Sequence, residues 1–193
     1  MRMRDSVTIR KKGICWAVLL LMTACASTDS YKDPKMDFGS INTVAVMPFA
    51  NLSKDALAGD RVRDVFMTML LATGDVYVLP QGEVAKGIAT SGIANPVAPS
   101  KEEIIKLASQ LKADAVITAV IREYGELRSG SASANVISLS LQMTEVQTGT
   151  VILSLSSSKG GISFLDRLFG GGGEPMNTIT EKTVKDIVDR LFE

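Results

Sequence analysis

The segment ISLSLQMT, residues 137–144, alternates apolar and polar side chains along its whole length. A period of two residues is typical of a β-strand with one buried and one exposed face. The segment VILSLS, residues 151–156, alternates in the same way, and the turn-forming sequence QTG, residues 147–149, lies between the two. The pattern therefore predicts a β-hairpin with an exposed Ser- and Thr-rich face and the following buried residues: Ile137, Leu139, Leu141 and Met143, then Val151, Leu153 and Leu155.

On both sides of this hairpin the sequence predicts further strands and helices. Residues 41–49 form a nearly continuous β-branched and apolar run, which is typical of a strand buried on both faces. Ser100 with Glu103 has the spacing of a capping box at the start of a helix, and Thr178 with Glu181 has the same spacing. Apolar periodicity and turn residues place the other elements: helices over 55–73, 83–89, 100–112 and after Thr178, and strands over 76–79 and 113–124.

The order of these elements predicts the fold class. It reads β-α-β-α-β-β-β-α over residues 41–193, with no internal repeat. Such an order indicates a single-domain α/β fold, in which a mixed β-sheet has helices packed against it. About 150 residues are enough for one domain to bury a sizeable core.

The first 24 residues have the pattern of a signal peptide. Five basic residues precede an apolar run over residues 14–22, which is too short to span a bilayer as a helix. The sequence LMTAC, residues 21–25, resembles a lipobox, in which the cysteine is linked to diacylglycerol before the leader is removed. We therefore expect a signal peptide over 1–24, an acyl lipid on Cys25 and a flexible polar tether over 25–40. The alternatives are an ordinary secretory peptide with an incidental cysteine, or an uncleaved anchor.

Charge and cysteine content limit the function classes. The chain has 21 basic and 21 acidic residues, and removal of the leader leaves 16 basic and 20 acidic residues. A mildly acidic domain gives no support for nucleic-acid binding. Of the two cysteines, Cys15 leaves with the leader and Cys25 carries lipid, so we expect a mature domain without a disulfide. Beyond the lipid on Cys25 we expect no cofactor and no metal.

Residues typical of catalysis are scarce, so we expect no enzymatic activity. The chain contains no histidine, the commonest general base and zinc ligand. The glycine run over residues 170–173 lacks the Lys-Ser/Thr that follows a phosphate-binding loop. A flexible linker explains that run better, and solvated charge explains the carboxylate pair of Glu102 and Glu103.

Glycines also enclose an apolar insert over residues 160–174. Its residues Phe164, Leu165, Leu168 and Phe169 would share one face of a short helix. Three contacts remain open for this face: the parent domain, a partner protein or the membrane interface. We expect these four residues to be candidate partner-contact or membrane-contact residues.

Three short segments carry a resemblance to a known superfamily. They are the strand and turn VAVMPFANLS over 44–53, the strand entry KADAVI over 112–117 and the hairpin turn VQTGT over 146–150. Their order resembles that of the curli-secretion (CsgG-type) and LpoB-type outer-membrane lipoproteins and of the amino-terminal domain of TolB. Residues 122–135 and 160–174 stand where the curli channel has membrane-spanning hairpins. Both are shorter than such a hairpin requires, so we expect the domain without the pore.

The resemblance implies an outer-membrane location, with the domain facing the periplasm and tethered through Cys25. It also implies a non-enzymatic protein that binds other envelope proteins in secretion, surface-structure assembly or regulation of cell-wall synthases. The alternative is an oligomeric ring subunit of an outer-membrane export channel, so a homo-oligomer stays open. An enzyme or small-ligand binder would need a polar pocket that the sequence does not indicate.

Overall fold

The computed structural model describes residues 30–129, 132–161 and 173–192 of the chain. Within these ranges, one seven-stranded sheet is accompanied by four α-helices and one 3-10 helix. The strands are β1 (Ser30–Lys32), β2 (Thr43–Val46), β3 (Ala50–Asn51), β4 (Tyr77–Val78), β5 (Ala115–Ser129), β6 (Ala132–Glu145) and β7 (Thr150–Gly160). The helices are η2 (Phe38–Ser40), α2 (Ala58–Thr73), α3 (Gln81–Ser91), α4 (Lys101–Leu111) and α6 (Met176–Leu191).

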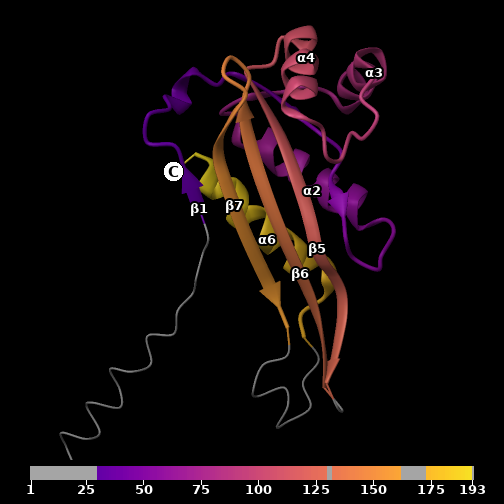
Figure 1. The fold of residues 1–193 in the computed structure, drawn as a ribbon. Helices are drawn as coiled ribbons and strands as arrows, with labels where there is room; N and C mark the ends of the chain where they lie inside the picture. Colours follow the sequence, from indigo (N-terminus) through magenta and orange to yellow (C-terminus); the bar gives the residue numbers. More distant parts are fainter. Residues whose placement is uncertain (1–29, 130–131, 162–172, 193) are drawn as a thin grey trace, which may run out of the picture.

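The sheet is mixed, with the strand order β1-β7-β6-β5-β2-β4 (Figure 1). β2 runs parallel to β4 and β5, and the short β3 pairs with β5 beyond the end of β2. β5, β6, β7 and β1 are successively antiparallel. Parallel neighbours need helical crossovers, which α2 supplies before β4 and which α3 and α4 supply before β5. The predicted single α/β domain with a mixed sheet is confirmed.

Helices cover the two faces of the sheet differently. α2 and α6 pack on one face, and their residues Phe66 and Ile187 belong to the larger core. α3 and α4 pack on the other face near β2, where Val84 and Leu107 belong to a smaller core. Alternate residues of the segment 44–47 enter these two cores, and all four are 0% exposed. The prediction of a strand buried on both faces is confirmed.

β6 and β7 form the predicted hairpin, with one difference in the second strand. Leu153 and Leu155 of β7 are buried as predicted, but Ile152 is also buried and Val151 is only partly buried. A β-bulge in the β6–β7 pairing leaves Ile152 as the extra residue, because Val151 pairs with Thr144 while Leu153 already pairs with Met143. All the predicted core residues of β6 are buried: Ile137, Leu139, Leu141 and Met143.

The two predicted capping boxes have different outcomes. The Ser100 hydroxyl accepts a hydrogen bond from the Glu103 amide at 3.2 Å, and the Glu103 carboxylate accepts one from the Ser100 amide at 2.7 Å. This prediction is confirmed. The prediction for Thr178 is wrong, because α6 already begins at Met176, directly after Pro175. Proline is well tolerated at the start of a helix, so Thr178 lies inside the first turn rather than at the cap.

The ordered domain begins earlier than the sequence indicates. Residues Ser30–Lys32, within the predicted tether, form β1 and pair with residues 153–155 of β7. The 3-10 helix η2 follows at residues 38–40. All three β1 side chains are exposed, so the strand has no buried apolar pattern for a sequence to display. The prediction of a flexible tether up to residue 40 is therefore wrong from Ser30 onwards, and residues 25–29 lie outside the described residues.

Candidate functional site

One long edge of β5 loses its partner halfway along the strand. β2 and β3 pair with β5 as far as Ile121, and the Leu52 amide donates the last hydrogen bond of this edge to the Ile121 oxygen at 2.9 Å. A β-bulge at Arg122 follows in the β5–β6 pairing. From there to Ser129, β5 pairs with β6 on one side, and no other described strand pairs with its outer edge. Unpaired main-chain groups of this kind can accept an additional strand.

The loop between β3 and α2 folds over the start of this free edge. The side-chain amide of Asn51 donates a hydrogen bond to the main-chain oxygen of Asp55 at 2.7 Å. The side-chain oxygen of Asn51 accepts one from the main-chain amide of Ser53 at 3.0 Å. The Asp55 carboxylate accepts from the Leu57 amide at 2.9 Å and forms an ion pair with Arg61 at 2.7 Å. These local contacts hold the loop as a wall beside β5.

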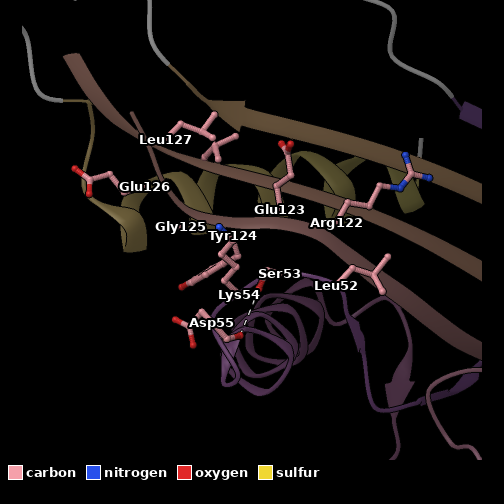
Figure 2. Close-up of a pocket in the computed structure, with 11 residues that line it drawn as sticks. Leu52, Ser53, Lys54, Asp55, Arg122, Glu123, Tyr124, Gly125, Glu126 and Leu127 are labelled. Carbon is pink, nitrogen blue, oxygen red and sulfur yellow. Dashed lines mark hydrogen bonds between the residues drawn. The ribbon is translucent and has the colours of Figure 1, made fainter. Parts of the chain in front are cut away.

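Between this loop and the free edge lies an open groove of 550 Å³ (Figure 2). Tyr124 points from β5 toward the loop that carries Lys54, whereas Glu123 and Leu127 point to the opposite side of the strand. Apolar side chains border the groove, and Leu52 is 71% exposed and Leu127 45% exposed. Exposed large apolar residues beside an unpaired strand edge are features of protein-binding surfaces.

The charged groups of the groove are mixed in sign. Arg128 forms an ion pair with Glu126 at 2.8 Å. The pKa of Glu126 lies below its usual value because its carboxylate accepts hydrogen bonds from Arg128 and from Ser133. Lys54 and Asp55, which also line the groove, carry opposite charges. The groove therefore has no strong preference for an acidic or a basic segment.

The backbone of β5 is unusual at Gly125, in the middle of the groove. Its φ of 139° lies in a region that residues with a side chain rarely adopt. A Cβ atom at this position would meet no other atom within 4 Å. Open space beside the main chain leaves room for a second chain to approach the strand edge closely.

The sequence singled out the lipidation site and the apolar insert as functional residues. Cys25, Phe164, Leu165, Leu168 and Phe169 all lie outside the described residues. Two described residues at the ends of the insert, Gly161 and Glu174, both form hydrogen bonds with Asn135 of β6, next to the hairpin end that also carries Leu127. The sequence did not indicate the groove, because its walls come from segments about 70 residues apart.

Other kinds of site are not indicated in the described part of the chain. Its His, Cys, Asp and Glu residues form no group of three or more that could hold a metal ion. Its helices include none that is long and apolar enough to cross a membrane. Among the groups that the structure does place, the groove beside β5 is the strongest candidate for a functional contact.

The fold is the α/β fold of the LpoB-like lipoproteins. The chain belongs to the family described as "Putative lipoprotein GNA1162-like", whose family model matches residues 36–190. A search of curated protein sequences gave no match.

Three solved structures illustrate the likeness, and each is similar in fold. Lipoprotein GNA1162 from Neisseria meningitidis is 19% identical with a TM-score of 0.57, over 78% of this chain and 98% of that one. The PelC dodecamer from Paraburkholderia phytofirmans is 14% identical with a TM-score of 0.55, over 84% and 96%. The LpoB C-terminal domain from Salmonella enterica is 15% identical with a TM-score of 0.51, over 66% and 87%. None of the three is named for an enzymatic activity.

Proposed function

We propose that this protein is a non-enzymatic lipoprotein whose periplasmic domain binds another envelope protein in secretion, surface-structure assembly or cell-wall regulation. In this proposal the acyl lipid on Cys25 holds the chain in the outer membrane. The groove beside the free edge of β5 is the protein-binding surface.

The observation that carries the proposal is the unpaired length of β5 between Arg122 and Ser129. Natural sheets usually protect such an edge with charge, a bulge or a covering element. On β7, β1 pairs with residues 153–155 and covers that part of the strand edge. On β5 a bulge at Arg122 and several charged side chains mark the free edge, but no described strand covers it. This edge adjoins a groove with exposed leucines. The uncovered main-chain groups beside these leucines support strand addition by a partner at β5.

Two further observations support a binding role. Family membership supports a lipoprotein, and the full sequence lacks histidine, which most acid–base and zinc chemistry uses. The LpoB-like and PelC-like folds of the matched structures are also consistent with an envelope protein.

Site-specific photocrosslinking in intact cells tests the proposal. A photoreactive amino acid at Leu127, on the unpaired length of β5, is compared with one at Leu71, a 57% exposed leucine on α2. We expect one discrete adduct from position 127 that position 71 does not give, and its loss when Leu52 is changed to Asp. Equal adducts from both positions, or none from position 127 in cells where the protein is abundant, would contradict the proposal.

A second candidate function is a ring subunit of an export channel. It is favoured by one observation, the similarity in fold to a PelC structure described as a dodecamer. Light scattering of the lipidated protein in mild detergent distinguishes the two candidates. A mass of many copies favours the ring, and a monomer at micromolar concentration contradicts it.

A further inference from the structure

The position of β1 limits how far the domain can move from its anchor. β1 begins at Ser30, which pairs with Leu155 of β7. Ser30 is five residues along the chain from Cys25, with four residues between them. A chain spans at most about 3.4 Å per residue, so Ser30 lies within roughly 17 Å of the Cys25 Cα atom. If Cys25 carries lipid, as the proposed function requires, the β1 edge must stay near the membrane surface.

The strand order then decides which surface is turned away from the membrane. β1 is one end of the sheet order, and β7 and β6 separate it from β5. Figure 1 shows β1 at one side of the sheet and the loop between β3 and α2 at the other. Neighbouring strands are about 4.8 Å apart, so β5 lies roughly 14 Å from β1 across the sheet. The groove therefore lies on the side of the sheet away from β1.

The surface around β1 has side chains that suit a lipid interface. Tyr31 is 49% exposed and Phe192 is 40% exposed. Phe192 borders a hollow of 310 Å³ together with Lys32 and Phe38, and the Lys32 ammonium lies 4.6 Å from the centre of the Phe38 ring. Aromatic rings and lysine stems favour the boundary between lipid headgroups and acyl chains.

Electrostatic attraction contributes little to this surface. Asp75 lines the same hollow, and Asp33 and Asp37 lie within five residues after β1, so acidic groups balance the charges of Lys32 and Lys35. A contact made here depends on aromatic burial rather than on anionic lipid. Its strength should therefore change little with ionic strength.

We infer that the β1 edge, comprising Tyr31, Lys32, Phe38 and Phe192, lies on the surface of the membrane that holds the lipid anchor. The free edge of β5 then faces the periplasm, where a partner can reach it. The acyl lipid supplies the attachment, and a protein contact of this kind adds to it and sets the orientation of the domain.

Fluorescence quenching by nitroxide-labelled lipid tests this orientation. The lipidated protein is reconstituted in phosphatidylethanolamine–phosphatidylglycerol vesicles with a single fluorophore at Lys35→Cys or at Lys54→Cys. The two positions form a matched pair, because both are exposed lysines in loops, one beside β1 and one in the groove. We expect at least threefold stronger quenching at position 35, with the same ratio in 0.5 M salt. Equal quenching, or stronger quenching at position 54, overturns the inference.

Vesicle flotation before the measurement separates this inference from the proposed function. Protein that does not float with the vesicles contradicts the lipid anchor itself. When the protein floats, Tyr31→Ser combined with Phe192→Ser should reduce quenching at position 35 by at least half. Both residues are exposed, so the fold should persist, and unchanged quenching in the double variant overturns the aromatic contact.

Discussion

The side-chain amide of Asn135 donates a hydrogen bond to the main-chain oxygen of Glu174 at 2.9 Å. The main-chain oxygen of Asn135 accepts a second bond from the Gly161 amide at 2.8 Å. One residue of β6 therefore holds the chain at both ends of the glycine-flanked insert. The connection between β7 and α6 begins and ends at the same point of the sheet.

Replacement of Asn135 by Ala should weaken this closure. One hydrogen bond is lost while the one from Gly161 remains, so we expect the free energy of unfolding to fall by about 1 kcal/mol. Urea unfolding measures it. Asn95→Ala is the control, because the Asn95 side chain is exposed and makes no hydrogen bond to another described residue. A loss no larger than that of the control would show that the bond to Glu174 does not stabilise the domain.

Gly160→Ala should be more damaging. Gly160 has a φ of 85°, and an added Cβ atom would overlap the main-chain oxygen of Asn135. Strain and overlap together should lower the free energy of unfolding by more than about 2 kcal/mol. Gly82→Ala in α3 is the matched control, since a Cβ atom there meets nothing within 4 Å and should raise stability slightly. Thermal unfolding of both variants checks this, and equal melting temperatures would refute it.

Ser100 and Thr178, the two positions with capping-box spacing, should respond differently to replacement by alanine. Ser100→Ala removes the cap of α4 and should cost about 1 kcal/mol. Thr178→Ala should cost nothing measurable, because Thr178 lies within α6 and alanine favours a helix. Chemical denaturation compares the pair. A similar loss at both positions would mean that Thr178 does act as a cap.

The hairpin turn should make stability depend on pH in the acidic range. Burial raises the pKa of Glu145, but the hydrogen bonds from Thr148 and Gln147 together lower it by more. The resulting pKa lies below the usual value. The carboxylate therefore stabilises the fold above the pKa of the unfolded chain, about 4.3, and this contribution is lost as pH falls through the folded pKa. Glu145→Gln should cost about 1–2 kcal/mol at pH 7. The difference from wild type should shrink below about pH 4, and a constant difference would contradict this account.

Cys25→Ser should release a folded, soluble domain, because the acyl lipid is the predicted anchor. Membrane fractionation with carbonate washing, followed by circular dichroism of the released protein, provides the measurement. If the variant stays with the membrane, changing the predicted contact residues to Ser should release it; these are Phe164, Leu165, Leu168 and Phe169. Release by Cys25→Ser alone would show that the insert does not anchor the chain.

Local patterns in the sequence predicted much of the fold correctly. Alternation over residues 137–144 predicted which β6 side chains are buried, and the spacing of Ser100 and Glu103 predicted a cap that forms. Both features depend on residues within one element, so their physics is visible in sequence. The Thr178 spacing failed because Pro175 offered an earlier helix start. β1 was missed because an edge strand with exposed side chains contributes main-chain hydrogen bonds, which leave no apolar pattern.

By itself, the sequence determined the fold class and the expectation of a lipid anchor, since each depends on a short continuous pattern. Only the tertiary structure showed that β3 stops pairing with β5 at Ile121 and leaves the following strand edge unpaired beside Leu52. It also showed that the sheet begins at Ser30, which shortens the tether. These features arise from strand pairing between distant segments, and the register of such pairing is decided by the packing of the whole core.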